Sequence, residues 1–160
     1  MRKLIALSTA VIFVAGASQA EKLQFECTNL QGKHYYGDGG QTPEKNEGWI
    51  DDGISNGVFV TQFDLEDQSV TYRYKDATGV WYDPAQDEGG FVALVSMNNN
   101  YEGSFQIMIV TEGPDASNVT SVVINGIGSM APTMLMNATR HGYINSSRTF
   151  YTEECTMAAG

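Results

Sequence analysis

The amino-acid sequence predicts an all-β domain, a single antiparallel up-and-down β-barrel of about 8–9 strands, with a β-sandwich as the alternative. Short runs of alternating or wholly apolar residues recur about every ten residues, separated by Gly, Asn, Asp and Pro. After residue 20 no segment shows a convincing helical period. Cys27 and Cys155 lie near the two ends of the chain, and a disulfide between them would bring the first and last strands together. A meander whose ends meet in this way is a closed barrel.

The N-terminal segment MRKLIALSTAVIFVAGASQA (1–20) has the features of a secretory signal peptide. Arg2 and Lys3 precede an apolar run, and small residues, Ser18 and Ala20, precede the expected cleavage site. The apolar run is shorter than the roughly 20 residues of a membrane-spanning helix. We therefore expect residues 21–160 to form the single mature domain, exported to a bacterial periplasm or to the medium.

The expected strands follow one another with turn residues between them. In chain order they are 22–28, 57–65, 69–75, 80–83, 90–97, 103–112, 118–126, 133–136 and 147–156. A glycine-rich, charged stretch separates the first two strands, and its TPEK segment (42–45) predicts one helical turn, with Thr42 as the N-cap.

The three middle strands, between residues 90 and 126, are apolar on both faces. A sheet with one face in water should alternate apolar and polar residues, so we expect the outer face of these strands to be covered. A second sheet, the 29–56 segment, or another copy of the protein in a homodimer would cover it. We expect the core to include Phe91, Val95, Phe105, Ile107, Val119 and Val123.

The charge of the mature chain argues against two classes of partner. Without Arg2 and Lys3, 7 basic residues stand against 19 acidic ones, a formal charge of −12. Such a surface repels phosphate backbones and anionic headgroups, so we expect neither nucleic acid nor a membrane surface as partner.

A catalytic site is difficult to assemble from this sequence. Ser129 in GIGSMA (126–131) resembles the serine of a nucleophile elbow, but Ala131 stands where that motif needs glycine. The chain has two histidines, His34 and His141, and no carboxylate–histidine relay to Ser129 is identifiable. A small hydrolase is therefore a minor alternative, and we expect a non-catalytic protein without a cofactor.

Methionines form a weak candidate metal site near the C-terminal end. Met134 and Met136 share one face of a strand, and His141 follows on the opposite parity. Thioether and imidazole ligands suit Cu(I), whereas methionine is also an ordinary gap-filler of irregular cores. Cu(I) binding through these residues is the other minor alternative.

Aromatic residues give the main candidate site for a ligand. Tyr72 and Tyr74 share one face of the third expected strand, and the turn at Asp76–Gly79 sets Trp81 or Tyr82 opposite Tyr74. These rings either fill the core or, together with Trp49, line a cavity for a small amphipathic molecule.

In outline the predicted barrel resembles lipocalin-like and avidin-like barrels. The stretch ECTNLQGKHYY (26–36) places a cysteine and then a glycine before aromatic residues, as many small barrels do. The resemblance concerns architecture only, and no residue role is carried over from either family.

Two functions from different classes follow. In the first, the barrel holds an amphipathic ligand through Trp49, Tyr72, Tyr74 and Trp81. In the second, the protein is a protein–protein interaction or inhibitor-type module with a filled core, and its glycine-rich 32–57 segment is the contact. A cavity of a few hundred cubic ångströms would favour the first function, and a packed interior would favour the second.

Overall fold

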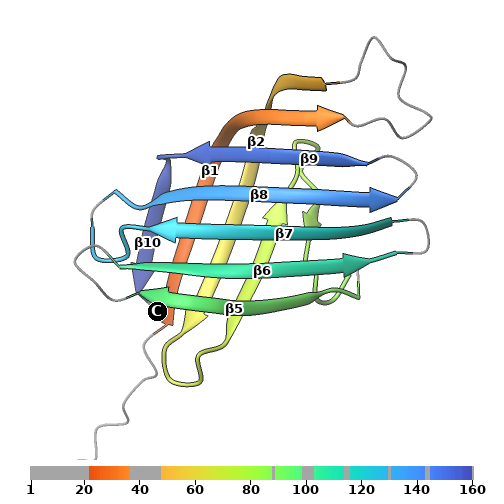
Figure 1. Cartoon of the computed structure of the whole chain (residues 1–160). Helices are drawn as coiled ribbons and strands as arrows, with labels where there is room; N and C mark the ends of the chain where they lie inside the picture. The colour runs from red at the N-terminus through yellow and green to blue at the C-terminus, as the bar shows by residue number, and fades with distance from the viewer. Residues whose placement is uncertain are drawn as a thin grey trace, which may run out of the picture.

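The computed structural model describes residues 22–36, 48–87, 89–98, 103–113, 116–129, 131–142 and 145–159. In these ranges the regular secondary structure is entirely β, and ten strands form one antiparallel sheet (Figure 1). The all-β, antiparallel prediction is confirmed. The expected signal peptide (1–20) and the expected helical turn at 42–45 lie outside the described residues. No helix in the described part of the chain is long and apolar enough to cross a membrane.

Several strands are longer than the sequence suggested. The strand expected at 22–28 continues to residue 36, and the one expected from 57 already begins at 48, so the two form a long hairpin. The last expected strand is split in two at a corner around Glu153 and Glu154. The strands are β1 (Lys22–Tyr36), β2 (Gly48–Asp64), β3 (Val70–Lys75), β4 (Trp81–Tyr82), β5 (Phe91–Asn98), β6 (Ser104–Glu112), β7 (Ala116–Asn125), β8 (Thr133–Gly142), β9 (Ser146–Thr152) and β10 (Cys155–Ala159).

The order of the strands is that of a meander whose ends meet. It runs β4-β3-β2-β1-β9-β8-β7-β6-β5, and β10 pairs with β1 beside this path. A closed barrel would need only one further ladder, between β4 and β5. β4 has two residues, and Pro84, which lacks a backbone N–H, follows it in a turn, so β4 offers β5 little to pair with. The sheet is therefore a curled half-barrel with a seam between β4 and β5.

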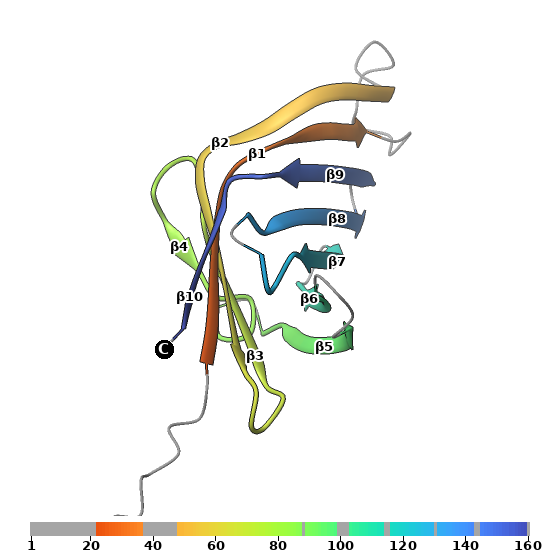
Figure 2. The ribbon, with the colours of Figure 1, turned by 90° about the vertical axis from the view of Figure 1, so that its left-hand side faces the viewer.

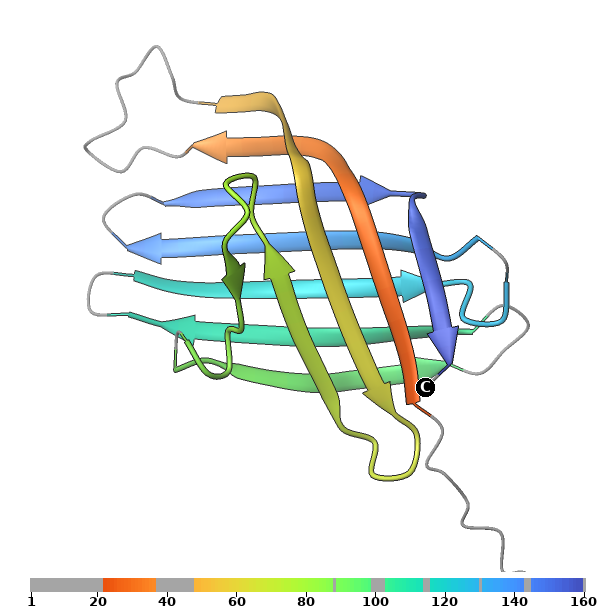
Figure 3. The same cartoon turned by 180° about the vertical axis from the view of Figure 1, so that it is seen from behind.

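A corner in β1 lets the sheet curl. β1 pairs with β10 through its first half and with β9 through its second half, and a bulge between Thr28 and Leu30 separates the halves. Asn29 has a positive φ of 53° at this point. Hydrogen bonds hold the corner: Thr152 Oγ1 donates to the Thr28 carbonyl at 2.7 Å, and the Thr28 N–H donates to the Glu154 carbonyl at 3.0 Å. The strands β5–β9 consequently cross β1–β3 at a steep angle (Figures 2 and 3).

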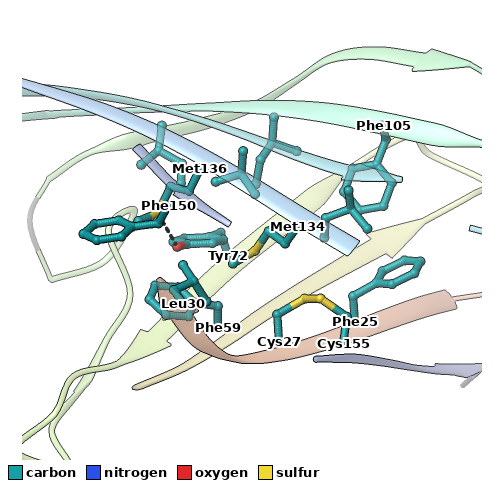
Figure 4. Packing of buried hydrophobic residues seen from close by; sticks show 14 residues of the cluster. Phe25, Cys27, Leu30, Phe59, Tyr72, Phe105, Met134, Met136, Phe150 and Cys155 are labelled. Atoms are coloured by element: carbon teal, nitrogen blue, oxygen red, sulfur yellow. Dashed lines mark hydrogen bonds between the residues drawn. A yellow bond between two sulfur atoms is a disulfide. The ribbon is translucent and has the colours of Figure 1, made fainter. Parts of the chain in front are cut away.

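The predicted disulfide is present and lies between the first and last strands. Cys27 and Cys155 are register partners in the β1–β10 ladder. The two cysteines belong to the packed core (Figure 4). Phe105 contacts Phe25 edge to face, with ring centres 5.3 Å apart, and stacks on Phe63 at 5.8 Å. Other buried members of the core are Leu30, Phe59, Tyr72, Ile107, Ile109, Val122, Ile124, Met134, Met136 and Phe150.

The core prediction was right for β6, the central one of the three middle strands. It was wrong for its neighbours β5 and β7. Phe105 and Ile107 are buried. Phe91 and Val95 in β5 are 60% and 52% exposed, and Val119 in β7 is 38% exposed. Val123 lies on the same outer side of β7 as Val119 and is only partly buried.

Pairing with β6 decides which face of these strands points inward. Ile107 is the register partner of Leu94 in β5 and of Val122 in β7, so those residues share its inward face. Because both faces of these strands are apolar, hydrophobic alternation alone could not show which residues face inward. Within the described part of the chain nothing covers the outer face of β5–β8, which faces the viewer in Figure 1.

Candidate functional site: a cavity on the concave side

A cavity of about 430 Å³ lies beside the packed core. One wall comes from β2 and β3, and the opposite wall comes from β6–β9. The wall from β2 and β3 is mainly aromatic and includes Phe59, Tyr72 and Tyr74. The wall from β6–β9 includes Ile109, Thr111, Asn118, Thr120, Met136, Ala138, Arg140, Ser146 and Arg148.

The inward-facing residues of the wall from β6–β9, every second residue of each strand, change from polar to apolar along the strands. The register places these residues in three successive rows across the four strands. The outermost row is wholly polar, the middle row is mixed, and the innermost row is wholly apolar. The rows are Thr111–Asn118–Arg140–Ser146, then Ile109–Thr120–Ala138–Arg148, then Ile107–Val122–Met136–Phe150. The concave face is thus amphipathic along the strand direction.

The aromatic wall is built by stacked rings. The ring of Tyr74 stacks on Tyr82 at 5.1 Å and on Phe59 at 6.1 Å between ring centres. Tyr72 is buried, and its hydroxyl donates to Met136 Sδ across the interior at 3.8 Å (Figure 4). Burial raises the pKa of Tyr72 far above its ordinary value, so this hydroxyl stays neutral. The wall therefore offers ring faces and no charge at Tyr72.

A series of polar contacts links Arg148 to His34 and Asp52. Arg148 Nε donates to His34 Nε2 at 3.3 Å, and His34 Nδ1 lies 3.2 Å from Asp52 Oδ2. Because Nε2 accepts a hydrogen bond, Nδ1 carries the proton and donates to Asp52. His34 is buried and stacks on Tyr36 with ring centres 3.9 Å apart. Burial, and secondarily the Arg148 charge, lowers the pKa of His34, although Asp52 opposes this shift.

The lowered pKa makes the stability of the fold depend on pH. Below the ordinary histidine value of 6.5 the unfolded chain takes up a proton that folded His34 resists. We expect stability to be lost as pH falls from about 7 through the folded pKa, and His34→Gln to flatten this dependence. Urea unfolding at a series of pH values measures it. The matched control is His141→Gln on the exposed outer face, which should keep the wild-type slope; equal slopes for all three proteins would contradict the assignment.

The predicted ligand residues fall into three places. Tyr72 and Tyr74 lie together in the cavity wall. Trp81 is 49% exposed on the opposite face of the β3–β4 hairpin, where Arg73 Cζ and Lys75 Nζ lie 6.0 and 5.8 Å from its ring centre. Trp49 is 56% exposed, lies 5.3 Å from Tyr35 between ring centres, and lines a separate shallow hollow on the outer face. The structure thus brings the two tyrosines together and places both tryptophans elsewhere.

The weaker candidates of the sequence are not brought together. Met134 and Met136 are buried and face inward, whereas His141 is exposed on the outer side of β8. Ser129 Oγ donates to the Gly126 carbonyl at 2.9 Å within a turn. Among the described residues, no group of three or more His, Cys, Asp or Glu could hold a metal ion.

The polar lining of the cavity was missed by sequence reasoning. Arg140, Arg148 and Asn118 lie in strands, on the parity that faces inward. The available signal was that polar residues of this parity gather at the same end of neighbouring strands. Phe105 and Ile107 show which residues of β6 face inward. Pairing the other strands with β6 as a meander would then have aligned these polar residues in rows.

Fold and cavity together define a curled antiparallel half-barrel with a packed apolar core and, beside it, an amphipathic cavity. Comparisons of the chain with protein-family models, curated proteins and solved structures find no match. The resemblance to lipocalin-like and avidin-like barrels therefore stays one of outline.

Proposed function

We propose that this protein is an exported, non-catalytic binding module that holds a small amphipathic molecule in the concave cavity. The observation that carries the proposal is the change from a polar to an apolar row along the cavity wall. A molecule with a polar and an apolar end matches both rows in one orientation. A volume of about 430 Å³ lies within the usual range of ligand sites, roughly 300–1,000 Å³.

The disulfide supports the proposal that the protein is exported. A disulfide between Cys27 and Cys155 is compatible with an extracellular or periplasmic location, because such bonds persist in oxidising compartments. The basic, apolar and small-residue pattern of residues 1–20 supports the same proposal.

Filling the cavity tests the proposal. Ala138 faces the cavity from β8, and Ala138→Phe places a ring where the ligand would lie. We expect wild-type protein to bind decanol or decanoate in isothermal titration calorimetry, and Ala138→Phe to weaken that binding at least about tenfold, because the added ring takes up the space for the ligand.

The control is the neighbouring residue on the other face of the same strand. Asn137 is exposed on the outer side, so Asn137→Phe adds the same ring away from the cavity. This variant should bind like wild type, and thermal unfolding should show that both variants are folded. Absence of binding to any amphipathic probe, or unchanged binding by Ala138→Phe, would remove this function from consideration.

A second candidate is association with another protein, and the uncovered outer face favours it. Phe91, Val95, Met108 and Val119 are exposed on adjacent strands of that face. Exposed apolar patches are common at association sites, and a homodimer would cover this one. The 32–57 segment expected as the contact forms the paired ends of β1 and β2, except for 37–47, which lies outside the described residues. Sedimentation equilibrium tests the dimer: a monomer at all concentrations would exclude it.

A further inference from the structure

The charge of the cavity is opposite to the charge of the protein. From residue 21 onward the formal charge is −12 and only three arginines occur, Arg73, Arg140 and Arg148. Two of these three line the cavity, together with one acidic side chain, Asp76. A positive lining inside a strongly negative protein attracts anions to this site.

The two cavity arginines are placed close to each other. Arg140 is the register partner of Ser146, and Arg148 is the register partner of Ala138. Arg140 and Arg148 are therefore diagonal neighbours on β8 and β9, a relation that separates Cα atoms by about 7–8 Å. Two guanidinium groups at this spacing can reach the same anionic group.

Neither guanidinium is neutralised by a carboxylate in the part of the chain that the structure describes. The ion pairs there join Lys22 to Asp64 and Lys33 to Asp51, and Asp52 accepts a hydrogen bond from neutral His34. Arg148 uses its Nε for His34, so its terminal Nη groups remain to donate elsewhere. Arginine presents a planar fork of donors that suits the two oxygens of an anionic head group.

The acidic side chain of the lining is engaged in its own turn. Asp76 Oδ1 accepts hydrogen bonds from the Thr78 N–H at 2.9 Å, from Thr78 Oγ1 at 2.7 Å and from the Val80 N–H at 3.1 Å. It belongs to the β3–β4 turn, whereas the arginines belong to the wall from β6–β9. An anionic group is thus repelled by the β3–β4 turn and attracted to the row that holds Arg140.

We infer that the ligand of this cavity is an amphiphile with an anionic oxygen head group, a carboxylate in its simplest form, bound by Arg140 and Arg148. The inference rests on the proposed function and adds the chemistry of the polar end. The apolar part of the ligand lies against Met136 and Ile109, and Ser146 and Asn118 lie in the same polar row as Arg140.

Probes that share one alkyl chain and differ in head group test this inference. We expect full-length mature protein to bind decanoate about tenfold or more tightly than decanol, because hydrogen bonds to a charged group are stronger than neutral ones. Decyltrimethylammonium should bind more weakly than decanol. Raising the salt concentration should reduce the preference for decanoate, since both arginines are exposed to water. Decyl phosphate, measured beside decanoate, decides whether the head group is a carboxylate or a phosphate.

Three variants assign the preference to particular residues. Arg140→Gln, alone and together with Arg148→Gln, should bring decanoate down to about the affinity of decanol, and should weaken decanol binding much less than decanoate binding. The single variant leaves the contact between Arg148 and His34 in place, so it stays informative if the double variant unfolds. Arg73→Gln, which removes an arginine from the outer face next to Trp81, is the matched control and should behave like wild type.

The outcomes separate this inference from the proposed function. Binding of decanol and decanoate with equal affinity, unchanged by Arg140→Gln, would overturn the anionic head group and leave an amphipathic site. Equal loss of decanoate binding in Arg73→Gln would also overturn it, because only net charge would then matter. Absence of binding by every probe would instead overturn the proposed function itself.

Discussion

Removing the disulfide should lower the free energy of unfolding by roughly 4–5 kcal/mol. Cys27 and Cys155 are 128 residues apart, so the bond closes most of the chain into one loop. In the chain-entropy account, a cross-link that closes a longer loop restricts the unfolded chain more and stabilises the fold more. For a domain of this size the loss corresponds to a fall in melting temperature of on the order of 10 °C or more.

Calorimetry of the oxidised protein, the reduced protein and a Cys27→Ala/Cys155→Ala variant measures this effect. The double variant should melt near the reduced protein and should not respond to reductant. Thiol labelling of the unfolded, unreduced protein should find no free sulfhydryl, because the two cysteines of the sequence are both in the bond. A fully reduced protein with an unchanged melting temperature would show that the bond does not stabilise the fold.

Ile107→Ala should cost about 2–5 kcal/mol of stability, the usual range for a fully buried isoleucine. Ile107 is fully buried between its register partners, Leu94 in β5 and Val122 in β7. Removing its side chain leaves a cavity among residues that are themselves fixed in ladders. The next residue, Met108, points outward and is 36% exposed, so Met108→Ala should cost much less, about 1 kcal/mol or below.

Urea unfolding of the two variants tests which face of the β5–β8 strands points inward. β5–β8 are paired in register, so an error of one residue in β6 would move every inward residue of that layer to the outside. A larger loss for Met108→Ala than for Ile107→Ala would mean that the inward face is wrongly assigned.

Much of the fold could be predicted because its signals are local. Alternation located β1 and β3, turn residues separated the strands, and the two cysteines placed the first and last strands side by side. The length of the turn left Trp81 or Tyr82 as the residue opposite Tyr74, and the register shows that it is Tyr82. These features depend on neighbours in sequence or on one covalent bond.

Features that depend on how strands pair could not be predicted from the sequence. The phase of β5 and β7 is set by pairing with β6, and their apolar residues on both faces left Phe91 and Val119 ambiguous. The extension of β1 to residue 36 depends on pairing with β9, which replaces β10 beyond the bulge at Asn29. The seam depends on β4 being too short to pair with β5.

The candidate site was predictable in part for the same reason. Tyr72 and Tyr74 share one strand, so parity placed them together. Trp49 and Trp81 were grouped with them by residue type, but the register pairs Trp81 with Lys75 and so puts it on the other face of the hairpin from Tyr72 and Tyr74. Arg140 and Arg148 belong to the site only because β8 and β9 are adjacent, and single charged residues within strands gave no sign of this.

The order of the strands also determines the sequence separation between strands that pair. Apart from the pairing of β1 with β9 and β10, every ladder joins strands that follow each other in the chain. Hairpins of this kind close in about 1–10 μs, whereas non-local pairing slows folding. The single long-range step is the meeting of β1 with the C-terminal strands, and the bond between Cys27 and Cys155 lies in that ladder. A chain that unfolds with this bond intact therefore begins each refolding with its most distant strands already tethered.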